Sequence, residues 1–364
     1  MIEGITTYGS ESLINEIKDK HPVFICTIGT TETSLIPGIS GAGATPELTE
    51  YTPAADVELM VLGEVRCSDS MAQTVVGDVV TPTPAVLTKA AIGVADIPFV
   101  IVNAGSKITP DIDCMKLCND YGRDVRTGKA IKNPLEIFEN AKELGLKLTR
   151  MHDYLVIGES IAAGTTTALG VLKALGYEAD GKVSGCMPTN PHDLKTAVVD
   201  EGLKNAGIDP EKDDIDAFQA IAAVGDPIIP AIAGLVLGTN IPIILAGGTQ
   251  MVAVCAVIKA IDPNFDFSRI NIATTVYVVE DETADLLHLV KEVDENITVH
   301  SVDPGFEDAE YEGLKNYVEG HVKEGAGAGG MMFTALIRGN SVEKLRNAID
   351  KACQWKKEKR IFLE

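Results

Sequence analysis

The chain has 364 residues, 45% of them hydrophobic, and a formal net charge of −22. This length can bury a large core, whereas the acidic balance argues against nucleic acid as a partner, because phosphate binding needs a basic surface. No apolar run reaches the roughly 20 residues that span a bilayer, and residues 1–20 lack the basic and apolar regions of a secretory signal. We therefore expect a cytoplasmic protein without a membrane partner.

Short apolar runs alternate with helical stretches from near residue 20 to near residue 300. The runs are mostly continuous in hydrophobicity, which is typical of strands buried on both faces of a parallel sheet. They predict strands at 23–28, 99–102, 154–157, 241–245, 272–279 and 297–302.

Helix start and stop signals lie between these runs. Asn133–Pro134 opens a helix that we expect to close at Gly145, and Asn190–Pro191 opens one that ends near Gly207. Two further helices are predicted at 165–175 and 252–261.

The last helix is predicted to begin at a capping box of Asn340 with Glu343. An apolar helix at 227–237 fits two interpretations, a buried core helix or a contact surface between two copies of the chain. The polar stretch 105–132 is long for a connection, and such loops are usually functional or mobile.

The repeated strand–helix order predicts an α/β fold with a doubly wound, mostly parallel sheet flanked by helices. We expect residues 20–305 to form a nucleotide-binding core. The terminal segments 1–19 and 306–364 are expected to form a small helical subdomain that carries the glycine-rich loop around Glu324.

The seven cysteines are scattered and odd in number, which favours reduced thiols over a disulfide framework. Cys114 and Cys118 form a lone C-x3-C pair, which is more typical of one face of a helix than of a metal site. The six histidines show no H-x-x-x-H spacing. We expect neither a metal nor another cofactor.

Two glutamates lie beside glycine-rich turns, each ahead of a predicted helix: Glu324 in the segment 323–330 and Glu159 in the segment 158–167. Glycine lets backbone N–H groups approach a ligand closely, and a helix N-terminus favours an anion. Because a glutamate is a poor neighbour for a phosphate, we expect Glu324 to face a group that loses a proton. The two turns indicate acid–base chemistry on a phosphorylated small molecule.

Ligands in open α/β sheets bind at the carboxyl ends of the strands, so the glycine turns could converge on one crevice. For the threonine-rich turn, an ordinary N-cap remains the alternative. The candidate substrate-binding residues of the turns are Gly158, Gly164, Thr165, Thr166, Gly247, Gly248, Thr249, Gln250, Gly325 and Gly327.

Two further polar residues have both a binding and a structural interpretation. Asp226 precedes a helix and could bind a hydroxyl group, or it could simply interact with the helix dipole. Lys195 lies one turn into the helix after Asn190–Pro191 and could pair with a phosphate, although a lone lysine there is usually solvated.

The segment 325–330 also matches G-x-G-x-x-G, the fingerprint of dinucleotide-binding proteins. No buried strand is predicted before it, and too little chain follows for a βαβ unit. A dinucleotide-dependent oxidoreductase is therefore a minor alternative.

Taken together, four strings resemble the nicotinate-nucleotide–dimethylbenzimidazole phosphoribosyltransferase family, and its archaeal branch in particular. The resemblance extends over nearly the whole chain. Its carriers are the residues at 51–58, 158–170, 245–251 and 323–330.

The resemblance implies an enzyme of cobalamin biosynthesis that exchanges the nicotinate of nicotinate mononucleotide for a benzimidazole-type base. Glu324 matches the general base, and Glu159 matches a second glutamate in the nucleotide site. Lys195 and the Thr165–Thr166 turn would hold the phosphate, and the active form would be a homodimer. The alternative is a non-catalytic mononucleotide-binding protein on the same fold.

Overall fold

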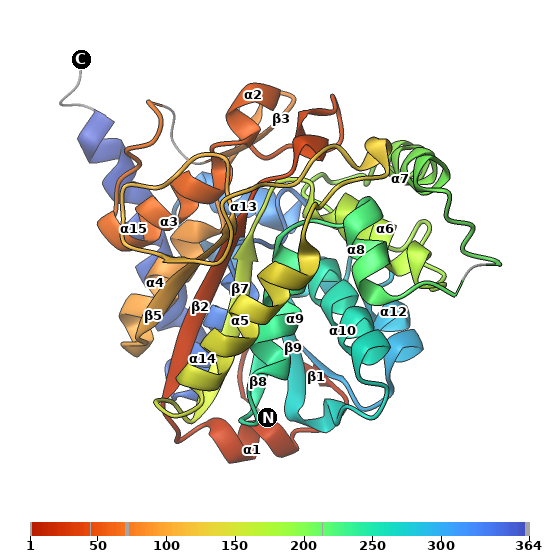
Figure 1. Ribbon diagram of the computed structural model, residues 1–364. Coiled ribbons are helices and arrows are strands. Elements are labelled where there is room, and N and C mark those ends of the chain that lie inside the picture. Colours follow the sequence, from red (N-terminus) through yellow and green to blue (C-terminus); the bar gives the residue numbers. More distant parts are fainter. Residues whose placement is uncertain (1, 44, 70–72, 213, 361–364) are drawn as a thin grey trace.

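The structure, a computed structural model, describes residues 2–43, 45–69, 73–212 and 214–360, which form three layers with a central sheet between two layers of helices (Figure 1). The sheet has eight strands in these residues. In spatial order they are β1 (Ile5–Tyr8), β10 (Thr298–Val302), β9 (Ile270–Thr275), β8 (Ile243–Ala246), β7 (Tyr154–Ser160), β2 (Pro22–Gly29), β5 (Phe99–Gly105) and β6 (Met115–Lys116).

All neighbouring strands of this sheet are parallel except β1, which pairs antiparallel with β10. The central strands are buried along their whole length, because helices cover both faces. This confirms the predicted α/β fold with a mostly parallel sheet. A separate hairpin consists of β3 (Gln73–Val76) and β4 (Val79–Pro82).

Each face of the sheet has its own hydrophobic core. One core contains side chains of the helices α5 (Pro134–Leu148), α6 (Gly164–Ala174), α7 (His192–Ala206), α8 (Ala217–Val224), α9 (Ile228–Leu237), α10 (Thr249–Ile261) and α12 (Leu286–Val293). The other contains side chains of α1 (Ser12–Ile17), α3 (Thr52–Leu62), α4 (Ala85–Ala95), α13 (Glu312–Val318), α14 (Ala328–Ile337) and α15 (Val342–Arg360). The short helices α2 (Pro46–Thr49) and α11 (Val276–Val279) lie in connections.

The chain order of the strands reverses between β2 and β7. From β2 the chain moves outward to β5 and β6, and from β7 it moves in the opposite direction to β8, β9 and β10. Crevices for ligands form at such switch points, beyond the carboxyl ends of the strands. Glu159 and Ser160 end β7 at this point.

Several predicted element boundaries differ from the structure, and three of the differences have a clear physical reason. The strand expected at 272–279 ends at Thr275, and its β-branched continuation Val276–Val279 forms α11. The helix expected to close at Gly145 continues to Leu148, because Gly145 is a packing position: a Cβ there would lie 2.4 Å from the carbonyl oxygen of Leu235 in α9. For the last helix, the Ser341 hydroxyl accepts the Lys344 N–H at 3.1 Å, one residue later than the predicted cap at Asn340.

The terminal segments, predicted to form a small helical subdomain, take part in the main layers. Residues 5–8 form β1 at the edge of the sheet, and α14 packs directly on strands β7 to β10. Helix α9 also lies inside the layered core: residues Ile228 to Val236 are all buried, and α5 and α10 pack against it. The core interpretation of this helix is therefore correct, and it offers no surface to a second copy.

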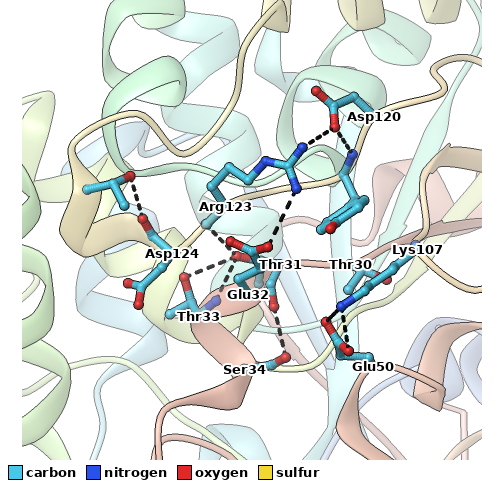
Figure 2. Close-up of polar contacts among 12 residues, drawn as sticks. Thr30, Thr31, Glu32, Thr33, Ser34, Glu50, Lys107, Asp120, Arg123 and Asp124 are labelled. Carbon is cyan, nitrogen blue, oxygen red and sulfur yellow. Dashed lines mark hydrogen bonds and ion pairs between the residues drawn. The ribbon is translucent and has the colours of Figure 1, made fainter. Parts of the chain in front are cut away.

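The polar connection 105–132 is anchored over the carboxyl edge of the sheet. Arg123 donates to Asp120 at 2.7 Å, and the Thr31 hydroxyl donates to the Arg123 carbonyl at 3.1 Å (Figure 2). Lys107 forms an ion pair with Glu50 at 2.6 Å. Cys114 and Cys118 flank β6 in this connection, so they do not lie on a helix as expected.

Candidate active site

A cavity lies at the carboxyl edge of the sheet, beside the switch point. It encloses about 910 Å³ of space, including its open mouth. Its lining includes residues 39, 40 and 42, 159–165 from the end of β7, 184–187, 248–250 after β8 and 322–326 before α14, together with Asp56 and Lys195. The segments 159–165, 248–250 and 322–326 carry polar residues singled out from the sequence, and Lys195 is another such residue.

Glu324 lines this cavity at the N-terminus of α14. Its Oε1 accepts the N–H groups of Gly325 and Gly329 at 3.0 and 3.1 Å, and its Oε2 accepts the Thr275 N–H at 3.2 Å and the Thr274 hydroxyl at 3.1 Å. These donors stabilise the carboxylate, but burial has the larger effect and raises the pKa of Glu324 to about 7. The side chain is therefore divided between its acid and base forms near neutral pH.

Glu159 lines the same cavity from the end of β7 and is 3% exposed. Its Oε1 accepts a hydrogen bond from Gln250 at 3.3 Å, whereas its buried Oε2 has no partner among the residues that the structure describes. Burial raises the pKa of Glu159 well above its usual value, and the charges of Asp226, Glu324 and Asp56 raise it further. This environment thus favours the neutral form of Glu159.

Lys195 is a buried cation in the cavity lining. It is 1% exposed, and its ammonium group donates to the Thr165 hydroxyl at 2.9 Å. Burial lowers the pKa of Lys195 to about 8, so the side chain is still mostly charged at neutral pH. Within the described part of the chain this ammonium group has no carboxylate at hydrogen-bond distance, and a cation held out of water in this way suits an anionic ligand.

The structure divides the remaining predicted residues into two sets. Gly164, Thr165, Gly248, Thr249, Gln250 and Gly325 line the cavity, together with Glu159, Lys195 and Glu324. Gly158, Thr166, Asp226, Gly247 and Gly327 lie outside the lining. For Gly158 and Gly327 the reason is close packing, since a Cβ on Gly158 would lie 2.7 Å from the Cα of Gly327.

Asp226 is fully buried behind the cavity. Its Oδ1 accepts the N–H groups of Ile228 and Ile229 at 2.8 and 3.1 Å, and its Oδ2 accepts the Thr167 hydroxyl at 2.5 Å. Burial raises the pKa of Asp226 to about 6. This geometry favours the capping alternative for Asp226, and the carboxyl acts on the cavity through the pKa of Glu159.

Three charged residues of this region were given no role from the sequence. Asp56 of α3 lines the cavity and accepts the hydroxyls of Thr83 at 2.6 Å and Ser160 at 2.7 Å. Lys323, also in the lining, forms a buried ion pair with Asp281 at 2.6 Å. The signal for Asp56 was its place on a largely apolar helix, which also carries Glu58, whereas nothing in the sequence pairs residues 281 and 323.

Within the described part of the chain, no cluster of three or more histidine, cysteine, aspartate or glutamate side chains could hold a metal ion. None of the described helices combines the length and the apolar character needed to cross a membrane.

No protein-family model matches this chain. A UPF0284 protein of Methanothermobacter thermautotrophicus is 50% identical over 353 residues, which are 97% of this chain and 98% of that protein. A UPF0284 protein of Methanosarcina mazei is 43% identical over 340 residues, which are 93% of this chain and 95% of that protein. For a UPF0284 protein of Saccharolobus islandicus the identity is 42% over 344 residues, covering 94% of each chain.

Two crystal structures from Thermus thermophilus have the same fold. CobT superposes with a TM-score of 0.57 and 15% identity, over 89% of this chain and 83% of that one. A nicotinate-nucleotide–dimethylbenzimidazole phosphoribosyltransferase gives a TM-score of 0.55 and 16% identity, over 92% of this chain and 86% of that one. These similarities confirm the fold expected from the resemblance.

Proposed function

This chain belongs to the UPF0284 family, and from that premise, its fold and its cavity we propose that it is a phosphoribosyltransferase that exchanges the base of a nucleotide. One observation carries the proposal: a buried carboxyl group, Glu159, a partly buried one, Glu324, and a buried lysine, Lys195, line a single cavity. Such an arrangement combines a proton acceptor with a site for an anion.

Lys195 and Thr165 are proposed to bind the phosphate of the nucleotide. In a chain with a net charge of −22, a buried and mostly charged lysine is a local exception to the negative potential. Its ammonium group and the N-terminus of α6, where Thr165 lies, both favour a phosphate.

The proposed reaction is a displacement at the anomeric carbon of nicotinate mononucleotide. A ring nitrogen of a benzimidazole-type base attacks C1′, the C1′–N bond to nicotinate breaks, and the bonding electrons leave with the nicotinate ring. Because that ring nitrogen is cationic in the nucleotide, it leaves as a neutral pyridine nitrogen without a metal ion. Attack from the opposite face gives an α-riboside phosphate.

Glu324 is proposed to take the N–H proton of the attacking base. A general base works best when its pKa lies near the operating pH, and the pKa of Glu324 is about 7. The N–H groups of Gly325 and Gly329 hold the carboxylate in place before the substrate arrives.

Glu159 is proposed to stabilise the positive charge that develops on the ribose. Its Oε2, which has no hydrogen-bond partner among the described residues, is available to the substrate, and a cationic nucleotide would offset the burial that favours the neutral carboxyl. Gln250 fixes the orientation of the other oxygen.

The substrates that we propose are those in the name of the second Thermus thermophilus protein, a nicotinate-nucleotide–dimethylbenzimidazole phosphoribosyltransferase. We propose the same substrates here and a place in cobalamin biosynthesis. The homodimer remains a prediction.

The direct test incubates the purified protein with nicotinate mononucleotide and, separately, dimethylbenzimidazole, hydroxybenzimidazole and adenine. Mass spectrometry should detect a riboside phosphate of the acceptor together with free nicotinate, and NMR should show the α-anomer. If nicotinate is released with none of these acceptors, base exchange is the wrong reaction.

A non-catalytic nucleotide-binding protein is the second candidate, because four donors already engage the Glu324 carboxylate, as they would engage a purely structural cap. Calorimetry combined with the turnover assay distinguishes the enzyme from the non-catalytic protein. Tight binding of nicotinate mononucleotide without turnover, unchanged in Glu324→Gln, would support this alternative.

A further inference from the structure

The backbone that leads into Glu324 has an uncommon conformation. Val322 and Lys323 have φ angles of +71° and +62°. The N–H of Lys323 donates to the His321 carbonyl at 3.0 Å, and the N–H of Glu324 donates to the Val322 carbonyl at 2.8 Å. Three-residue turns with a positive φ at the central residue are rare and strained, particularly for a β-branched residue such as valine. Strained backbone of this kind persists only where the surroundings enforce it.

A buried ion pair holds this segment from the side. The Lys323 ammonium lies 2.6 Å from Asp281 Oδ2, and both side chains are 3% exposed. Asp281 is itself fixed: its Oδ2 accepts hydrogen bonds from Ser184 at 2.7 Å and Asn190 at 2.8 Å. Lys323 is therefore paired with a carboxylate whose own position is held by two hydrogen bonds.

The same segment is also held through its backbone. The Thr275 hydroxyl donates to the Lys323 carbonyl at 2.6 Å, and the Val322 N–H donates to the Cys186 carbonyl at 2.9 Å. These two contacts hold the backbone of residues 322–323, whereas the ion pair holds the side chain of Lys323 just before Glu324.

We propose that Asp281 is a positioning residue, which acts through Lys323 to hold Glu324 at the N-terminus of α14 with its carboxylate facing the cavity. This inference rests on the proposed function, because it assigns a role to the approach of the catalytic base. With the chain entering α14 through these two turns, the carboxylate accepts the N–H groups of Gly325 and Gly329. A shift of about 1 Å in a reacting group costs on the order of 100-fold in rate.

The test compares Lys323→Gly with wild type. Glycine adopts a positive φ without a steric penalty, so the substitution removes the tether without adding strain. Asp96→Gly is the matched control: Asp96 is also a non-glycine residue at positive φ, +50°, at the end of α4 and outside the cavity lining. Asp281→Asn is the second variant, since it removes the charge at the other end of the pair.

We expect kcat to fall by about 10- to 100-fold in Lys323→Gly and in Asp281→Asn, and to stay at the wild-type value in Asp96→Gly. For Lys323→Gly, KM for the nucleotide should change by less than about threefold, because the charge of Lys323 lowers the pKa of Lys195 and its removal leaves that cation intact. An unchanged kcat with a raised KM would overturn the proposal, since Lys323 would then be a phosphate ligand.

A second readout does not depend on turnover. Hydrogen exchange followed by mass spectrometry reports on the Gly325 and Gly329 amides, which donate to the Glu324 carboxylate. In a folded Lys323→Gly protein they should exchange about tenfold faster than in wild type. Unchanged exchange would refute the tether, even if no acceptor supports catalysis and the proposed function itself fails.

Discussion

Replacing Glu324 by glutamine should abolish most of the turnover while leaving the fold and nucleotide binding intact. Glutamine has nearly the same shape and still offers one oxygen to the N–H groups at the start of α14, but it cannot accept a proton. Positioned general bases contribute about 10²- to 10⁴-fold to rates. We therefore expect kcat to fall by that factor, or about 2.7–5.5 kcal/mol in activation free energy.

The structure also sets the pH dependence of the wild-type rate. With a pKa of about 7, Glu324 is deprotonated in about one molecule in ten at pH 6 and in about nine in ten at pH 8. The rate should rise roughly tenfold per pH unit below pH 7 and level off above it. The pKa of Glu159, which lines the same cavity, is also raised, and the charge of Glu324 contributes to that rise.

Quenched time points analysed by liquid chromatography, from pH 5.5 to 8.5, give kcat for wild type and Glu324→Gln. The matched control is Glu319→Gln, which makes the same change at an exposed position five residues earlier. If Glu324→Gln keeps the wild-type rate, or keeps the inflection near pH 7, Glu324 is not the proton acceptor.

Three further predictions concern the phosphate site and the fold. Lys195→Met should weaken nicotinate mononucleotide binding by about 10- to 100-fold in calorimetry, whereas Lys204→Met, an exposed lysine on the same helix, should not change it. Gly234→Ala should lower the free energy of unfolding by about 1–3 kcal/mol in urea melts, because its Cβ would lie 2.3 Å from the Phe138 carbonyl oxygen. Gly93→Ala, with nothing within 4 Å, should raise it by about 0.5–1 kcal/mol. A carboxyl with a raised folded-state pKa contributes stability at low pH that is lost as pH rises, so Tm should fall between about pH 5 and 7.5. In Glu324→Gln, the loss of unfolding free energy over this pH range should be smaller than in wild type by on the order of 3 kcal/mol.

The strands were largely predictable because burial on both faces leaves a continuous apolar signal, as in Pro22–Gly29. Strand β1 was missed because its four residues at the edge alternate between half-buried and exposed. The run Val276–Val279 has the composition of a strand, but it begins where the chain leaves the sheet and turns past Glu324. The secondary structure of this segment is therefore set by tertiary contacts and not by local β-propensity.

The candidate site was predictable where residue type and local turn coincide, as for the glutamates before α6 and α14. The Asp281–Lys323 pair was not, because the two residues lie far apart in sequence and each looks like an ordinary surface charge. Thr166 was predicted to bind the substrate but lies outside the cavity lining. It shares the turn of Thr165 but points into the protein interior, and sequence spacing alone cannot separate the two.

Helix α14 covers strands β7 to β10, and the turn that leads into it carries the Glu324 carboxylate. Because the ribosome makes the chain from its N-terminus, β7 and α6 emerge long before this helix does. Until α14 docks, the nascent protein exposes an apolar sheet face and has no complete nucleotide pocket. Substrate therefore cannot assist the early stages of folding, and we expect chaperones to shield that face during synthesis.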